Sequence, residues 1–268
     1  MSNRIFRDDL LKDKVAFITG GGSGIGLRMA ERFAEHGARL MLVGRTPEKL
    51  DHAVEQIEAA GGKAIRAVAD VRDYAAVEAA LAATREQLGE IDIVVCGAAG
   101  NFPAPALGMS ANGFKSVVDI DLLGTFHTCR AAFQHLRKPG ASIIAISATH
   151  AFMPVMLQSH VCAAKAGIDM LVKVLAMEWG PVGVRVNCIS PGAVDDTEGM
   201  RRLTPTDEMR QKLINTIPLR RYATKDELAD LALFLCSESA TYITGAVFVC
   251  DGGQSLMGSG AFAQAMGL

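Results

Sequence analysis

The chain has almost no excess of charge of either sign. Its 27 lysine and arginine residues against 29 aspartate and glutamate residues give a net charge of −2 over 268 residues. A protein that binds nucleic acid through its overall charge carries an excess of positive groups. We therefore expect no nucleic-acid partner, while a local basic patch for an anionic substrate is still allowed.

Segments that would direct the chain to a membrane, or hold it there, are missing as well. No apolar run reaches the ~18 residues that a membrane-spanning helix needs, and residues 1–9 contain no apolar signal core. The C-terminal Met-Gly-Leu is not a peroxisomal address of the Ser-Lys-Leu type. We expect a cytoplasmic protein with no membrane partner.

The cysteines do not form the pairs that metal or redox motifs use. None of the six is spaced as Cys-x-x-Cys, and most lie in apolar runs. This usage is typical of buried free thiols in a reducing compartment. No metal site is predicted.

The chain is instead rich in apolar residues, at 50%, and they fall in short β-rich runs that alternate with longer helical patterns. The expected strands are Val15–Thr19, Leu40–Val43, Ala64–Val68, Ile91–Cys96, Ser142–Ile146, Arg185–Ile189 and Val247–Cys250. The expected helices are Gly26–His36, Pro47–Ala60, Ala75–Leu88, Gly113–Leu136, Val161–Trp179 and Lys225–Cys236. Strand–helix alternation over the whole length predicts an α/β fold, with about seven parallel strands, helices on both faces and right-handed crossovers. Residues 1–268 are predicted to form a single domain.

Two segments depart from this alternation. Residues 194–222 are polar and are predicted to form a substrate lid; they carry Arg201, Arg202, Arg220 and Arg221. The tail Ser255–Leu268 is apolar and rich in small residues. Because an isolated monomer would expose this tail, we expect it to pack against a neighbouring subunit.

The segment Thr19–Gly26 reads Thr-Gly-Gly-Gly-Ser-Gly-Ile-Gly, and it follows an expected strand and opens an expected helix. Its glycines allow a tight turn and a close approach to a pyrophosphate, whose charge meets the helix N-terminus. This context predicts a dinucleotide site in a Rossmann-type, doubly wound sheet. The predicted cofactor contacts here are Gly20, Gly22, Ser23, Gly24, Ile25 and Gly26.

Residues at the ends of the second, third and fourth expected strands add to the predicted cofactor site, and one of them favours NADPH. Arg45 stands where an acidic residue would bind the ribose hydroxyls of NAD, and its guanidinium suits a 2′-phosphate, so NADPH is predicted. Asp70 and Val71 end the third strand, where a carboxylate can accept from an adenine amino group. The small residues Ala98, Ala99 and Gly100 end the fourth strand and leave room for the cofactor.

These motifs, with Asn-Cys-Ile-Ser-Pro-Gly at 187–192 and Asp-Gly-Gly at 251–253, resemble the short-chain dehydrogenase/reductase family over nearly the whole chain. In that family Asn, Ser, Tyr and Lys usually share the chemistry. The corresponding positions here are Asp121, Ala148, Val161 and Lys165, so only the lysine is retained. Reduction of a ketone needs an acid that protonates the carbonyl oxygen, and Val161 has no proton to give.

Two explanations of this loss are open. The chain is either a non-catalytic NADP(H)-binding protein or a reductase of a C=C bond conjugated to a thioester. In the second case charge moves onto the thioester oxygen, and positioned donors stabilise the resulting enolate. The proton then goes to carbon, with a bound water as the candidate donor.

Local sequence from about residue 8 to residue 253 resembles the 2,4-dienoyl-CoA reductase subfamily, most closely its peroxisomal type. The matching segments are Asp9–Ile18, Gly100–Pro103, Ser110–Lys115, Asp119–Asp121, Pro191–Gly192 and Thr197–Leu203. The resemblance implies an enzyme of auxiliary β-oxidation of unsaturated fatty acids that acts as a homotetramer. It would reduce 2,4-dienoyl-CoA to 3-enoyl-CoA with NADPH. Another tyrosine-less enoyl-thioester reductase is the alternative.

The resemblance also implies roles for individual residues. Asp121 and Lys165 would handle the proton, with Lys165 also bonding the nicotinamide ribose and Asp121 holding a water. His150 takes the position of a tyrosine in the mitochondrial-type enzymes and is a candidate donor to the thioester oxygen. Pro191 and Gly192 would contact the cofactor. The substrate contacts implied are Arg72, Phe102, Ser110, Ala111, Asn112 and Arg202.

Overall fold

The computed structural model describes residues 5–259. Its strands are β1 (Val15–Thr19), β2 (Arg39–Gly44), β3 (Lys63–Val68), β4 (Ile93–Cys96), β5 (Ser142–Ile146), β6 (Arg185–Pro191) and β7 (Val247–Cys250). Its α-helices are α1 (Gly24–Glu35), α2 (Pro47–Ala59), α3 (Tyr74–Leu88), α4 (Ala111–Val118), α5 (Gly124–Ala132), α6 (Ser159–Trp179), α7 (Glu198–Leu203), α8 (Asp207–Thr216) and α9 (Lys225–Cys236).

The strands form one sheet in the order β3-β2-β1-β4-β5-β6-β7, and every neighbouring pair is parallel. The chain winds outward in one direction through β2 and β3, and in the other through β4 to β7. The order therefore reverses between β1 and β4, where Thr19 pairs with Cys96. Ligands of doubly wound sheets bind at the carboxyl ends of the strands beside such a reversal.

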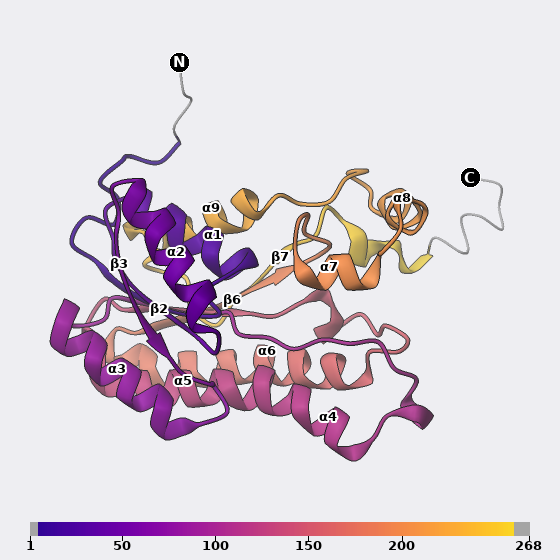
Figure 1. Cartoon of the computed structure of the whole chain (residues 1–268), viewed down its shortest axis with the longest axis horizontal. Helices are drawn as coiled ribbons and strands as arrows, with labels where there is room; N and C mark the ends of the chain where they lie inside the picture. The colour runs from indigo at the N-terminus through magenta and orange to yellow at the C-terminus, as the bar shows by residue number, and fades with distance from the viewer. Residues whose placement is uncertain (1–4, 260–268) are drawn as a thin grey trace.

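Two apolar layers cover the sheet. Buried side chains of α3, α5 and α6 pack on one face, and those of α1, α2 and α9 on the other. Figure 1 shows the first group below the sheet and the second above it. The strands of the centre are buried at every position because both of their faces are covered. The predicted doubly wound sheet of seven parallel strands is confirmed.

The helix expected over Gly113–Leu136 is interrupted. A π-helical turn, η2 (Asp119–Leu123), separates α4 from α5, and a 3₁₀ turn, η3 (Phe133–His135), follows α5. One extra residue in the turn changes the direction of the side chains around it, and π turns within helices are frequent at functional sites. Asp121 lies in this turn and is 1% exposed.

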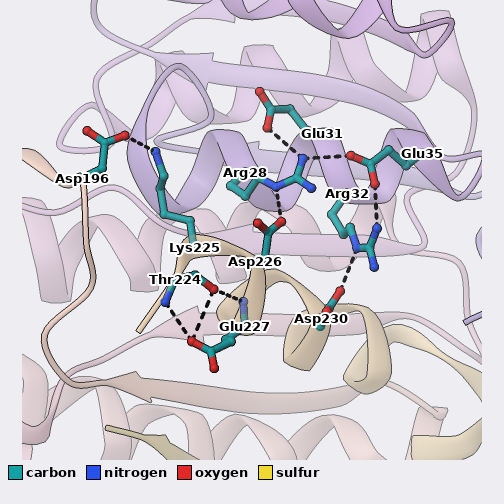
Figure 2. Close-up of polar contacts among 10 residues, drawn as sticks. All are labelled: Arg28, Glu31, Arg32, Glu35, Asp196, Thr224, Lys225, Asp226, Glu227 and Asp230. Atoms are coloured by element: carbon teal, nitrogen blue, oxygen red, sulfur yellow. Dashed lines mark hydrogen bonds and ion pairs between the residues drawn. The ribbon is translucent and has the colours of Figure 1, made fainter. Parts of the chain in front are cut away.

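Ion pairs fix α9 to α1 on the upper face of the sheet, as Figure 2 shows. Arg28 pairs with Asp226, and the Nε of Arg32 lies 2.7 Å from Oδ1 of Asp230. The N-terminal Lys225 of α9 extends this contact to Asp196, with 2.7 Å between Nζ and Oδ2. The beginning of the segment 194–222 is thereby tied to the body of the domain.

The segment 194–222 lies outside the sheet and its two covering layers (Figure 1). It consists of α7, α8 and their connections, and its own small apolar cluster includes Ala193, Ile217 and Tyr222. Its role as a lid stays a prediction. Residues 260–268, which form most of the tail expected to contact another subunit, lie outside the described residues.

Candidate active site

A cleft of about 420 Å³ opens along the carboxyl ends of six strands. It is lined by the segments that follow β1 to β6, together with parts of η2 and α6. Sixteen residues predicted as cofactor contacts or catalytic groups line it: Gly20, Gly22, Ser23, Gly24, Ile25, Gly26, Arg45, Asp70, Val71, Ala98, Ala99, Gly100, Asp121, His150, Lys165 and Pro191. The tertiary structure thus brings together residues that are spread over most of the chain.

The Gly-rich turn requires its glycines for steric reasons. Gly20 has a φ of +70°, and a Cβ there would lie 2.7 Å from the carbonyl oxygen of Gly97. A Cβ on Gly26 would lie 2.4 Å from the oxygen of Gly20. Ser23 precedes α1, but its side chain does not cap the helix, and the first turn holds no acidic residue. The N–H groups at this helix end therefore suit an anionic group of a ligand.

Two cationic side chains lie at the end of the cleft that follows β2. Arg45 and Lys49 both line the cleft, and both side chains are exposed. Neither forms an ion pair with any residue in the described part of the chain. Sequence reasoning missed Lys49, which lies in the first turn of α2, just after the connection that carries Arg45.

Asp70 also lines the cleft, but its carboxylate has a partner. Nη2 of Arg72 lies 2.6 Å from Oδ2 of Asp70, and Nε of Arg72 lies 3.0 Å from Oδ1. The hydrogen bonds from Arg72 hold the pKa of Asp70 below its ordinary value. Arg72 itself is half-exposed at the rim, outside the residues that line the cleft.

The centre of the cleft contains a buried ion pair. Lys165 Nζ lies 3.0 Å from Oδ2 of Asp121 and donates to the backbone oxygen of Ile146, also at 3.0 Å. Oδ1 of Asp121 accepts from the backbone N–H of Gly100 at 2.7 Å. The two side chains are 7% and 1% exposed, so both charges are held in place away from bulk water. The π turn thus positions the Asp121 side chain so that it contacts both the loop after β4 and α6.

Apolar groups occupy the two positions where the usual Ser and Tyr would stand. Ala148 and Val161 both line the cleft. Ser147 precedes the serine position and does not replace it, because its hydroxyl is buried and lies 3.5 Å from the backbone oxygen of Lys165. No hydroxyl group takes the place of the missing tyrosine on this wall.

Two polar side chains remain beside the pair. His150, in the 3₁₀ turn η4 (Thr149–Ala151), lines the cleft, and its buried Nδ1 has no hydrogen-bond partner among residues 5–259. Burial and, secondarily, the charge of Lys165 lower the pKa of His150, so its imidazole is neutral at neutral pH. Asn101, which sequence reasoning missed, lines the cleft with a buried Oδ1 that has no partner there either.

Residues 20–255 of the chain match the family model described as Enoyl-(Acyl carrier protein) reductase. A solved short chain dehydrogenase from Bacillus anthracis is 39% identical, with a TM-score of 0.82, and the match covers 91% of this chain and 97% of that one. The chain belongs to the short-chain dehydrogenase/reductase family. A short-chain dehydrogenase/reductase from Serratia marcescens is 29% identical, with a TM-score of 0.86, over 92% of this chain and 99% of that one.

The chain is also similar to curated relatives that are named 2,4-dienoyl-CoA reductases. The peroxisomal 2,4-dienoyl-CoA reductase SPS19 of Saccharomyces cerevisiae is 44% identical over 95% of this chain and 88% of the relative. The rat enzyme named peroxisomal 2,4-dienoyl-CoA reductase is 45% identical, with coverages of 94% and 87%. A probable 2,4-dienoyl-CoA reductase of Bacillus subtilis is 37% identical, with coverages of 92% and 98%.

As a short-chain dehydrogenase/reductase, the chain is an oxidoreductase that uses a nicotinamide cofactor. The uncapped start of α1 and the close approach of Gly20 to Gly97 fit a dinucleotide.

Within residues 5–259 no group of three or more His, Cys, Asp or Glu side chains is arranged to hold a metal ion. No helix of that range is long and apolar enough to cross a membrane. The expected cytoplasmic location stays a prediction, and the relatives named peroxisomal do not place this chain.

The substrate residues carried over from the family lie outside the cleft lining. Phe102 packs against His160, with 4.6 Å between ring centroids. Ser110 caps α4, accepting from the backbone N–H of Gly113 at 3.0 Å, and Ala111 and Asn112 are exposed in the first turn of that helix. Arg202 pairs with Glu198 on the exposed face of α7. Gly192, a predicted cofactor contact, is also absent from the lining, and its N–H donates to the oxygen of Cys250.

Proposed function

We propose that the protein reduces 2,4-dienoyl-CoA to 3-enoyl-CoA with NADPH, as an auxiliary enzyme in β-oxidation of unsaturated fatty acids. One observation carries the proposal: the cleft keeps the buried pair of Asp121 and Lys165 but has Val161 and Ala148 where a carbonyl reductase has its proton donor. Relatives of 41–45% identity that are named 2,4-dienoyl-CoA reductases support it. An acyl-CoA thioester is the proposed substrate.

Lys165 has the geometry to orient the cofactor. An ammonium group has three N–H donors. One is donated to the oxygen of Ile146, and the group forms an ion pair with Oδ2 of Asp121. A further donor is available for a hydroxyl of the nicotinamide ribose. When bound, NADPH supplies the hydride, which goes to C5 of the dienoyl chain.

Charge that develops on the thioester oxygen needs a donor, and two neutral groups are placed to supply one. His150 has a lowered pKa and donates one N–H in its neutral form. The side-chain amide of Asn101, which also lines the cleft, is the second proposed N–H donor. Donors fixed in a site that excludes water stabilise an oxyanion by several kcal/mol. Neither group has to transfer its proton for this effect.

Asp121 holds the proton source. With Oδ1 bound to Gly100 and Oδ2 facing Lys165, its carboxylate has lone pairs left for one ordered water. This water is the proposed proton donor to C2. The apolar side chain of Val161 offers the substrate no competing proton donor at the position of the usual tyrosine.

We propose NADPH as the cofactor because of the cations beyond β2. Arg45 and Lys49 are positioned to share a 2′-phosphate, and no acidic residue stands at the end of β2 to repel it. Phosphates of CoA are proposed to meet Arg72 and Arg202, after exchange of their present carboxylate partners. The segment 194–222 would close over them, and the enzyme is proposed to act as a homotetramer of single-domain subunits.

A second outcome is a different position of the double bond in the product. The relatives of yeast and rat are named (3E)-enoyl-CoA-producing, whereas that of Bacillus subtilis is named (2E)-enoyl-CoA-producing. Protonation at C2 gives the 3-enoyl product, and protonation at C4 gives the 2-enoyl product. Because Asp121 is the proposed water-holding group, we expect the 3-enoyl thioester.

The test is oxidation of NADPH, followed by absorbance, on addition of 2,4-hexadienoyl-CoA or 2,4-decadienoyl-CoA. Saturated acyl-CoA of the same lengths serves as the control, and NMR of the product locates the remaining double bond. Tight NADPH binding without oxidation by any dienoyl- or enoyl-CoA would leave only a non-catalytic NADP(H)-binding protein. Turnover of 2-enoyl-CoA alone would identify another enoyl-thioester reductase.

A further inference from the structure

His160 is a buried imidazole that the proposed mechanism does not use. It lies in the first turn of α6, five residues before Lys165, and is 0% exposed. Burial lowers its pKa, while a polar interaction with the backbone of Phe102 and the charge of Asp121 oppose that effect without cancelling it. His160 is therefore a neutral ring at neutral pH, packed within the protein and not directed at the cleft.

The side chain that covers His160 is Phe102. The two ring centroids are 4.6 Å apart and the ring planes meet at 57°. On its other side Phe102 reaches α4, since a Cβ on Gly113 would lie 3.4 Å from Cζ of Phe102. The phenyl ring thus lies between the first turns of two helices, α6 and α4.

The backbone around Phe102 has few other attachments. Two residues earlier, the N–H of Gly100 is bound to Oδ1 of Asp121, and two residues later the N–H of Ala104 donates to the oxygen of Leu157 at 2.9 Å. Among the described residues, no backbone–backbone hydrogen bond involves Asn101 or Phe102. Between the two attachments, Phe102 contacts His160 through both its ring and its backbone, and its ring also reaches α4.

We propose that His160 is a positioning residue for the substrate, acting through Phe102. The His160 ring fixes the position of the Phe102 ring, and this in turn fixes the neighbouring residue Asn101. The side chain of Asn101 lines the cleft that also contains Asp121 and Lys165. The inference rests on the proposed function, because it is the dienoyl thioester that Phe102 and Asn101 would contact. The cations that hold the cofactor, Arg45 and Lys49, lie beyond β2 at a different part of the cleft. Loss of the imidazole therefore weakens substrate binding and leaves cofactor binding unchanged.

The experiment compares His160→Ala with His160→Phe, which keeps an aromatic ring. We expect His160→Ala to raise KM for 2,4-decadienoyl-CoA by about three- to tenfold, the worth of an aromatic pair, with an unchanged Kd for NADPH. His160→Phe should restore KM to near the wild-type value. Phe102→Ala should raise KM to the same extent, and the double variant His160→Ala/Phe102→Ala no further, because the two rings act as one unit. His52→Ala, at an exposed position of α2, is the matched control.

Additive effects in the double variant would overturn the proposal, as would an equal rise in the Kd for NADPH or an unchanged KM. If His160→Ala does not fold, His160→Leu replaces it: leucine fills the space without a ring, so KM should rise with Leu and not with Phe. If the wild-type protein turns over no dienoyl-CoA, the proposed function fails separately. Calorimetric binding of 2,4-decadienoyl-CoA in the presence of NADP⁺ then makes the same comparison without turnover.

Discussion

Lys165 and Asp121 form a buried ion pair across the centre of the cleft, with 3.0 Å between Nζ and Oδ2. The two residues come from different helices, and each has a second partner: Ile146 at the end of β5 for the lysine and Gly100 in the loop after β4 for the aspartate. Removing one member of such a pair leaves an uncompensated charge in the interior. The pair is therefore a fixed junction between α6, η2 and the loop after β4, and it is also the proposed catalytic pair.

Replacing either member should reduce turnover severely. Asp121→Asn keeps an acceptor for the N–H of Gly100 but removes the charge that faces Lys165, and we expect kcat to fall by about 10²-fold. Lys165→Ala should reduce kcat similarly and also weaken NADPH binding. Steady-state kinetics and NADPH fluorescence titration measure the two effects. Lys173→Ala, at an exposed position of the same helix, is the control, and equal rates in Asp121→Asn would refute its role.

Restoring the missing tyrosine should not restore ketone reduction. Val161→Tyr places a large ring in the cleft, and we expect at least a tenfold loss of dienoyl-CoA reduction, with about 1–3 kcal/mol lost in the free energy of unfolding through overpacking. Val161→Phe should behave alike, because volume and not the hydroxyl causes the loss. We expect no ketone reduction because Ala148 and Asp121 also lack the usual serine and asparagine groups. Ketone reduction by Val161→Tyr alone would contradict this explanation. Assays with NADPH and a panel of ketones provide the measurement.

The cations beyond β2 should set the choice of cofactor. Arg45→Ala and Lys49→Ala should each raise KM for NADPH by about tenfold or more, since charge-assisted hydrogen bonds to a phosphate contribute about 1.5–3 kcal/mol. KM for NADH should stay nearly constant in both variants. Lys63→Ala, exposed at the opposite end of β3, is the control. If KM for NADPH and KM for NADH rose equally, these cations would not bind the 2′-phosphate.

The stability of the fold should fall in mildly acidic solution. The pKa values of His135, His150 and His160 are all lowered, chiefly by burial. The unfolded chain therefore binds more protons than the native chain once the pH falls below the ordinary imidazole value of about 6.5. The free energy of unfolding should be constant above that pH and decline below it. Urea unfolding over a pH series measures the slope; His150→Gln should flatten it, and His52→Gln, exposed on α2, should not.

Proteases should cleave the segment 194–222 more easily when the ion pair between Arg210 and Asp195 is removed. Arg210 of α8 makes two hydrogen bonds to the carboxylate of Asp195, at 2.8 and 2.7 Å. Because the pair is exposed, Arg210→Ala should cost less than about 1 kcal/mol of global stability. Limited proteolysis should nevertheless speed up within 194–222, and dienoyl-CoA with NADP⁺ should protect the wild-type segment. Lys212→Ala removes a neighbouring exposed pair with Glu208 and is the control. Absence of protection by substrate would argue against a lid.

Much of the fold was accessible from the sequence, since β1, β5, β7 and α9 have the bounds that their apolar runs predict. Patterns with a period are local properties of a chain, so strands, helices and their alternation can be inferred without coordinates. The interrupted helix around Asp121 was not inferred, because the π turn leaves the apolar pattern of its flanking helices unchanged.

The sequence by itself determined the Gly-rich turn, the arginine after β2 and the loss of the tyrosine, because each depends on which residue occupies one position. Only the tertiary structure decided what Asp121, Lys49, Asn101 and Phe102 face. The direction of a side chain depends on the elements that pack against it, and those come from distant parts of the chain. The ring pair of Phe102 and His160 joins residues 58 positions apart, and no local pattern encodes it.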